Sequence, residues 1–120
     1  MTNTKIVKRG EIYWAKDVPT ASGYTETTVY KNRHVLVYSS QASLKKSGVS
    51  TVIPLTSNVT KLGAVPSHVL IDTGTLKPSV LMPEQICTVP TLALTVKVAK
   101  VDDHTMTVID TAVSKQLGIS

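Results

Sequence analysis

The chain has 120 residues, a formal net charge of +5 and 42% hydrophobic residues, which excludes a disordered or fibrous protein and matches a single domain, 1–120. Its apolar runs are shorter than the ~20 residues of a membrane span, and its N-terminus lacks the apolar block of a signal peptide, so we expect a cytoplasmic protein. The single Cys87 excludes an internal disulfide and cannot build a thiolate metal site alone, so no metal is expected.

Seventeen valines and seventeen threonines favour strands, because β-branched residues suit a pleated surface better than a helix. Turn signals such as SG, LG and TGT separate the apolar runs. Several short strands at this spacing predict a small barrel or a sandwich. The predicted strands are 10–15, 33–39, 50–54, 67–71, 79–82, 84–90 and 94–98.

Residues 17–32, DVPTASGYTETTVYKN, form the longest stretch without steady apolar periodicity. Proline, glycine and hydroxyl residues are frequent in it, which predicts a loop or a loose hairpin. Connections of more than about 12 residues in a compact domain tend to be functional. We therefore interpret this stretch as a candidate ligand flap.

Residues 102–118 predict a helix, because apolar side chains recur near a 3.6-residue period. Asp102 or Asp103 can cap its first turn, and Gly118 can adopt the left-handed conformation that ends a helix. We expect this helix to pack across the barrel. The apolar positions are Met106, Ile109, Val113 and Leu117.

Positive charge is concentrated in the first half of the chain. Residues 1–61 hold nine Lys or Arg against three Asp or Glu, whereas residues 62–120 hold four against five. This asymmetry suits a polyanion or an acidic protein partner, although modest net positive charge more often marks only a solvated surface.

Four segments, together with the closing helix that ends in LG, resemble the MazF/PemK family of toxin endoribonucleases from type II toxin–antitoxin systems. The resemblance implies a mainly β fold with a C-terminal α-helix, a small SH3-like β-barrel that forms a homodimer. It also implies cleavage of single-stranded RNA without a metal or other cofactor, and neutralisation by a cognate antitoxin. The segments are RGEIYW at 9–14, NRHVLVYSS at 32–40, VIPLTSN at 52–58 and SVLMPEQICTV at 79–89.

The catalytic arginine and threonine of this family correspond to Arg33 and Thr56. RNA carries its own nucleophile, the 2′-hydroxyl, so a ribonuclease needs to remove that proton, stabilise the charged phosphate and protonate the departing oxygen. The planar guanidinium of Arg33 suits the phosphate, and the hydroxyl of Thr56 could donate to a phosphate oxygen. Without the resemblance to this family, we would interpret Arg33 as a surface charge and Thr56 as a residue that stabilises a turn.

Aromatic and basic residues around the long loop are candidates for RNA binding. Tyr24 and Tyr30 could stack on bases, and Lys16 and Lys31 could attract the phosphate backbone. The single Trp14 is interpreted as a core or interface anchor, because a lone large aromatic residue is usually structural.

Histidine is a candidate for proton transfer because imidazole titrates near neutral pH. His34 could line one groove with Arg33 if the strand start frays, although strict alternation points the two side chains to opposite faces. His68 and His104 are interpreted as loop-end and surface residues.

Three further polar residues correspond to positions near the RNA groove or the dimer surface in this family. Glu84 could act as a base and Gln85 could bond a base edge, or both could be solvated residues after Pro83. Ser79 is a candidate of the same kind.

The chain differs from the family pattern at two positions. His34 stands where the family usually has proline, and Cys87 stands at a frequent arginine position. The loop before Arg33 is longer, so the preferred RNA sequence is not carried over. Two other functions fit the resemblance: a non-enzymatic toxin of similar fold that binds a DNA topoisomerase, and an RNA-binding relative without turnover. An acidic, partly disordered antitoxin would fit the basic half of the chain.

Overall fold

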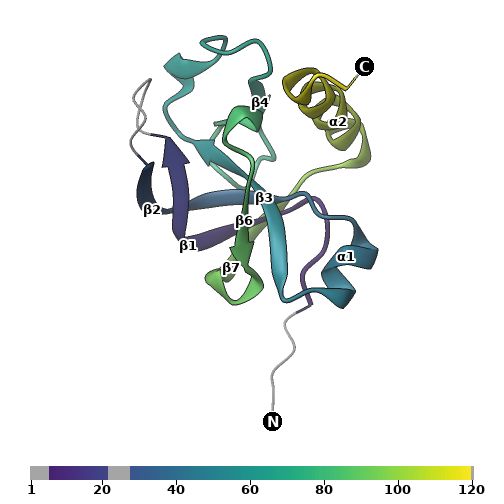
Figure 1. Cartoon of the computed structure of the whole chain (residues 1–120). Helices are drawn as coiled ribbons and strands as arrows, with labels where there is room; N and C mark the ends of the chain where they lie inside the picture. Colours follow the sequence, from purple (N-terminus) through teal and green to yellow (C-terminus); the bar gives the residue numbers. More distant parts are fainter. Residues whose placement is uncertain (1–5, 22–27, 120) are drawn as a thin grey trace.

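The computed structural model describes residues 6–21 and 28–119, so the predicted stacking residue Tyr24 lies outside the described residues. Strands dominate the chain, and one long helix closes it (Figure 1). The strands are β1 Glu11–Ala21, β2 Thr28–Val37, β3 Val49–Thr56, β4 Val69–Ile71, β5 Ser79–Leu81, β6 Cys87–Pro90 and β7 Leu94–Lys100. The helices are α1 Gln41–Lys46 and α2 Asp103–Leu117, with 3₁₀ turns η1 Val59–Lys61, η2 Pro83–Gln85 and η3 Thr91–Ala93.

All strand pairs are antiparallel and form one seven-stranded sheet in the order β4-β5-β3-β2-β1-β7, with β6 paired to β3. The prediction of a mainly β fold with a C-terminal helix is confirmed. Within the described residues, no pairing joins β7 to β4, so the sheet does not close into the complete ring of a barrel. The long strand β3 pairs with β2, β5 and β6 in turn and is the centre of the fold.

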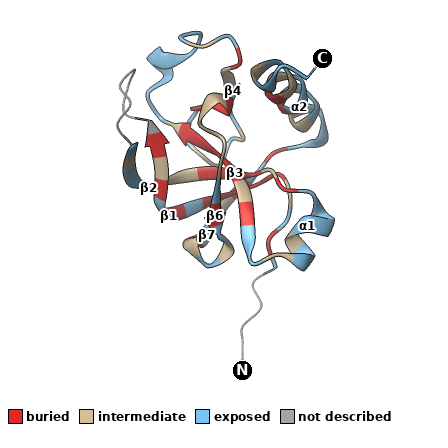
Figure 2. Cartoon of the chain, in the orientation of Figure 1, coloured by how far each residue is buried: buried red, intermediate tan, exposed pale blue. Residues whose placement is uncertain are grey.

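The central strands β1, β2 and β3 carry buried residues on both faces (Figure 2). One face carries Ile12, Leu36 and Ile53 and packs against Ile109 and Val113 of α2. The alternate residues form a second cluster under β6 and β7, with Tyr13, Val35, Val52, Val89 and Leu94. This explains why β2 and β3 read as continuous apolar runs, VLV and VIPL, since a strand buried on both faces cannot alternate with polar residues.

Much of the predicted loop 17–32 is instead a paired hairpin. The pairing of β1 with β2 continues from Val18 opposite Lys31 to Ala21 opposite Thr28. A β-bulge interrupts it between Ala15 and Val18, and Asp17 takes a positive φ of 53° there. Aspartate tolerates this left-handed conformation better than most residues. The loop interpretation is therefore wrong for the strand ends, and the hairpin alternative is correct.

Helix α2 begins and ends as the sequence predicts. Asp102 accepts a hydrogen bond from the Thr105 backbone N–H at 2.8 Å, and Gly118 exits with a φ of 72°. The apolar face is shorter than predicted, because Leu117 is 51% exposed. Helix α1 was not predicted, and the expected strand 84–90 begins only at Cys87, because Glu84 and Gln85 belong to the turn η2.

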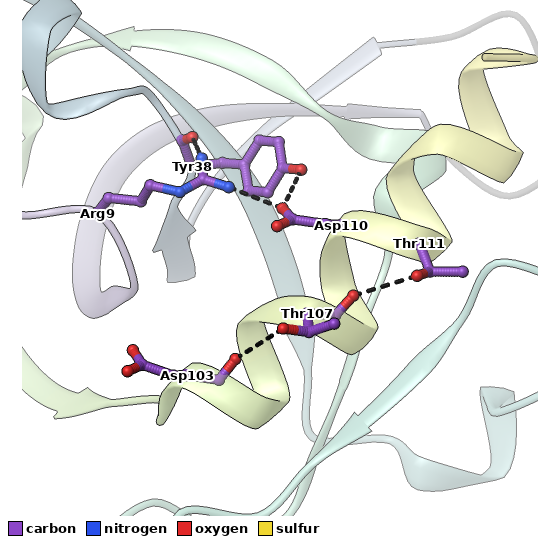
Figure 3. Close-up of polar contacts among 6 residues, drawn as sticks. All are labelled: Arg9, Tyr38, Asp103, Thr107, Asp110 and Thr111. Carbon is purple, nitrogen blue, oxygen red and sulfur yellow. Dashed lines mark hydrogen bonds and ion pairs between the residues drawn. The ribbon is translucent and has the colours of Figure 1, made fainter. Parts of the chain in front are cut away.

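Arg9, Tyr38 and Asp110 tie α2 to the sheet (Figure 3). The Arg9 guanidinium donates to the Tyr38 carbonyl, pairs with Asp110 Oδ1 at 2.7 Å and lies 4.2 Å from the centre of the Tyr38 ring. The Tyr38 hydroxyl donates to the same carboxylate oxygen at 2.6 Å. One cation, one ring and one carboxylate therefore hold together segments that are far apart in sequence.

In the described part of the chain, no helix has both the length and the apolar character needed to cross a membrane.

Candidate functional site

A groove on the sheet is lined by residues from the interior of β1 and β2, from the end of β3 and from the start of β5. Three of the residues that line it are cationic, namely Lys31, Arg33 and Lys77, and no carboxylate is among the described residues that line it. Hydroxyl, amide, imidazole and indole groups make up most of the rest. The lining residues are Trp14, Lys31, Asn32, Arg33, His34, Leu55, Thr56, Ser57, Leu76, Lys77 and Ser79.

Arg33 is half-buried at this groove. Its Nη2 donates to the Leu55 carbonyl oxygen at 3.2 Å, whereas its Nε is buried and finds no hydrogen-bond partner among the described residues. Burial lowers the pKa of Arg33, and the nearby Cys87 thiol acts in the opposite direction. A guanidinium remains charged throughout the pH range of proteins. The site therefore presents a fixed, incompletely satisfied cation.

Thr56 lies beside Arg33 because of the strand register. The last described partners of β2 and β3 are Val35 and Pro54. Since partners in an antiparallel pair advance in opposite directions, Arg33 and Thr56 occupy corresponding positions two residues further on. The Thr56 hydroxyl oxygen accepts a hydrogen bond from the Asn58 N–H at 3.2 Å, which leaves its own hydrogen available for a ligand.

Trp14 and His34 form an aromatic pair on the groove. They are directly opposite each other in the β1–β2 register, and their ring centres lie 4.9 Å apart at an interplanar angle of 71°. Trp14 is 37% exposed, so the core alternative predicted from the sequence is wrong, whereas the interface alternative stays a prediction. Burial lowers the pKa of His34, which keeps the imidazole neutral at neutral pH. Sequence reasoning missed Trp14 because strand alternation does not reveal which of two faces is covered.

The structure brings only some of the predicted RNA-binding residues into the groove. Lys31, His34 and Ser79 line it, although the Ser79 hydroxyl already donates to the Lys77 carbonyl at 2.8 Å. Lys16 and Tyr30 are exposed on the hairpin but do not line the groove.

The predicted pair Glu84 and Gln85 also lies outside the residues that line the groove. Glu84 contacts His68, with 2.9 Å between Oε2 and Nε2. Because two segments far apart in sequence form this contact, local pattern gave no signal for it.

Cys87 lies close enough to Arg33 for the two groups to interact electrostatically. Burial raises the pKa of the Cys87 thiol, and the Arg33 charge opposes that rise. The thiol therefore stays protonated and neutral at neutral pH. Within the described residues, no group of three or more His, Cys, Asp or Glu could hold a metal ion.

This fold and groove define a small β-rich protein with a cationic, hydroxyl-bearing cleft suited to a phosphodiester. A family model described as PemK-like, MazF-like toxin of type II toxin-antitoxin system matches residues 8–117. Endoribonuclease EndoA of Bacillus subtilis (strain 168) is 33% identical over 117 residues, which is 95% of this chain and 97% of that protein. The chain belongs to this PemK-like, MazF-like family of toxins, which confirms the resemblance read from the four segments.

Solved structures share the fold. An endoribonuclease from a Mycobacterial species has a TM-score of 0.74 at 19% identity, and the match covers 94% of this chain and 92% of that chain. An endoribonuclease in complex with its cognate antitoxin, also from a Mycobacterial species, has a TM-score of 0.68 at 21% identity, and the match covers 95% of each chain.

Proposed function

We propose that this chain is a single-domain endoribonuclease, the toxin of a type II toxin–antitoxin pair, and that it cleaves single-stranded RNA in the cytoplasm. The observation that carries the proposal is the groove itself, which combines three cations, the Thr56 hydroxyl and no carboxylate among its described lining residues. A polyanion that is cleaved by its own hydroxyl needs this combination of groups.

In the proposed reaction, the 2′-oxygen forms a bond to phosphorus while the bond from phosphorus to the 5′-oxygen breaks. The products are a 2′,3′-cyclic phosphate and a 5′-hydroxyl. Arg33 holds the non-bridging oxygens as negative charge develops, and Thr56 donates a hydrogen bond to the same phosphate. The departing 5′-oxygen takes a proton from solvent or from one of the groove lysines.

His34 is the candidate for removing the 2′-hydroxyl proton. It is the one described residue lining the groove whose side chain ordinarily exchanges a proton near neutral pH. Burial lowers its pKa, so the imidazole is in the neutral form that a general base requires.

The antitoxin is the proposed protein partner. A relative of the same fold has been solved in complex with its cognate antitoxin. In this chain the basic half, residues 1–61, supplies Lys31 and Arg33 to the groove, so an acidic and partly disordered antitoxin segment could occupy the groove and exclude RNA.

We also propose a homodimer as the active form. The described surface exposes large apolar side chains on η3 and β7, with Leu92 83% and Val96 56% exposed. Such side chains are typical of an interface. Light scattering should report a mass of two chains, and a monomer mass would refute this part of the proposal.

The proposed reaction is tested by incubating the purified chain with single-stranded RNA in excess EDTA and identifying the ends of the fragments. We expect fragments that carry 2′,3′-cyclic phosphates and 5′-hydroxyls. Intact RNA, together with stalled DNA replication in cells that express the chain, would instead select a topoisomerase-binding toxin. Retention of intact RNA by the protein would select an RNA-binding protein without turnover.

A further inference from the structure

A buried contact between His68 and Glu84 lies outside the residues that line the groove. The His68 side chain is 3% exposed, and its Nε2 is 2.9 Å from Oε2 of Glu84, whose side chain is 20% exposed. The other ring nitrogen, Nδ1, is 2.9 Å from the Lys61 carbonyl oxygen. Oε1 of Glu84 is buried and finds no hydrogen-bond partner among the described residues.

The geometry of this pair limits where its hydrogens lie. A carbonyl oxygen only accepts hydrogen bonds, so Nδ1 of His68 must carry a hydrogen and donate to Lys61. The contact between Nε2 of His68 and Oε2 of Glu84 therefore needs one further hydrogen, which one of these two atoms carries.

One side of the pair leads to the groove through η1. The Lys61 N–H donates to the Asn58 carbonyl at 3.1 Å, and the Asn58 N–H donates to the Thr56 hydroxyl at 3.2 Å. The His68 ring thus fixes the carbonyl of Lys61, the last residue of η1. The N-cap of η1, Asn58, in turn holds the Thr56 hydroxyl.

The other side leads to the same strand through η2. The Gln85 N–H donates to the Met82 carbonyl at 2.9 Å, and the Met82 N–H donates to the Pro54 carbonyl at 3.0 Å. Pro54 and Thr56 are two residues apart on β3. The contact between His68 and Glu84 therefore links two series of hydrogen bonds. Both series lead to the end of β3 that lies at the groove.

We propose that His68 and Glu84 are positioning residues that hold the Thr56 hydroxyl in the groove by sharing one hydrogen, so that RNA cleavage depends on this contact. This inference rests on the proposed function. Helix α2 reaches the same region through Gln116, which accepts a hydrogen bond from the Ser67 hydroxyl at 2.7 Å.

Loss of the contact has a defined consequence. When the contact between His68 and Glu84 is broken, the turn η1 is released and the Thr56 hydroxyl loses its fixed orientation. The rate of cleavage falls, and the amide hydrogens of Asn58 and Lys61 exchange faster.

Two variants at one position separate the shared hydrogen from simple packing. Glu84→Gln supplies an amide that can donate to the unprotonated Nε2 of a neutral His68, while Nδ1 still donates to Lys61. Glu84→Ala removes the partner altogether. We expect Glu84→Ala to lower kcat by about 10-fold or more, because displacement of a catalytic group is costly. KM should change by less than about threefold.

We expect Glu84→Gln to keep kcat within about threefold of the original chain, because the amide preserves a hydrogen bond to His68. Equal losses in the two variants would overturn the proposal and assign Glu84 to the chemistry as a base. Thermal unfolding of each variant establishes that the comparison is made between folded proteins.

The contact can be tested without RNA. The amide hydrogens of Asn58 and Lys61 should exchange faster in Glu84→Ala than in the original chain and in Glu84→Gln. Unchanged exchange in Glu84→Ala would overturn the proposal. If the chain fails to cut RNA, the proposed function is refuted, while these exchange rates still decide whether the pair holds the turn.

Discussion

Arg33 donates a hydrogen bond at 3.2 Å to the carbonyl oxygen of Leu55, the residue immediately before Thr56. The cation and the hydroxyl of the proposed site are therefore fixed to each other through one peptide unit. A guanidinium held in this way is already oriented before the substrate arrives, which reduces the reorganisation that the reaction requires.

Arg33→Ala should lower the rate of RNA cleavage by roughly 100-fold or more, because it removes a preorganised partner of the transition-state charge. Arg33→Lys should recover little, since an ammonium cannot hold two phosphate oxygens side by side. Single-turnover cleavage of a labelled RNA in EDTA measures both rates. Lys45→Ala, in α1 away from the residues that line the groove, is the matched loss of one charge and should cut at the original rate.

Thr56→Val keeps the shape of the side chain and removes its hydroxyl. We expect kcat to fall by about 10-fold or more, as loss of a hydrogen bond to a charged group costs about 1.5–3 kcal/mol. Thr56→Ser keeps the hydroxyl and should remain within a few-fold of the original chain. Equal activity of the Val and Ser variants would remove Thr56 from the mechanism.

The single tryptophan gives a direct test of contact with RNA. Trp14 is exposed on the groove, so binding of a 2′-O-methyl RNA, which lacks the attacking hydroxyl, should change its fluorescence. Trp14→Ala should weaken that binding roughly 5- to 150-fold, the equivalent of one stacked base at ~1–3 kcal/mol. Val108→Ala, at an exposed apolar position on α2 that does not line the groove, is the control and should bind as before.

The pH dependence of cleavage should identify His34. A base acts in its neutral form, so kcat should fall as pH falls through the pKa of His34, which burial places below its ordinary value of 6.5. His34→Gln should abolish this acid limb and lower kcat by about 100-fold or more. His104→Gln, on the exposed surface of α2, should keep the limb. An unchanged limb in His34→Gln would assign the base to another group.

The caps of helix α2 could be predicted from the sequence, whereas the strand pairing within the hairpin could not. Periodicity, the Asp102 cap and the Gly118 exit are local signals that fix a helix by themselves. Pairing of 17–21 with 28–32 is a contact between two segments that are mostly polar, and neither shows the alternation of a half-buried strand. Helix α1 has no buried residue and depends largely on the Ser40 cap, a signal common in loops.

The site was predicted only in part, because some of its contacts also join segments that are far apart in the sequence. Arg33 lies inside β2 and Thr56 ends β3, and the family resemblance named both as candidates because it covers the segments NRHVLVYSS and VIPLTSN. Trp14 was not predicted at the groove because it shares a face of β1 with the buried Ile12, and only the structure shows that this face is covered at Ile12 and exposed at Trp14. Glu84 was assigned to RNA because its partner His68 is 16 residues away in the chain.

Because of the buried Glu11, we expect the free energy of unfolding to fall at acid pH. Burial acts to raise its pKa, but hydrogen bonds from Lys97 and the Lys8 backbone, together with the charge of Lys97, outweigh that effect and lower it. A carboxylate with a lowered pKa stabilises the fold fully above its ordinary value of 4.5, and this contribution is lost as pH falls through the folded-state pKa. Urea unfolding should show this decline below pH 4.5 in the original chain.

Glu11→Gln should lower the free energy of unfolding at neutral pH by about 1–3 kcal/mol and flatten the acid decline, because the amide leaves Lys97 unpaired and does not titrate. Lys97→Ala should shift the decline to higher pH, since the 2.9 Å ion pair that lowers the carboxyl pKa is gone. Lys100→Ala is the matched control: Lys100 is the strand partner of Glu11 but forms no ion pair with it among the described residues. Its unfolding free energy should change by no more than about 0.5 kcal/mol. An acid decline that persists unchanged in Glu11→Gln would show that another carboxylate controls it.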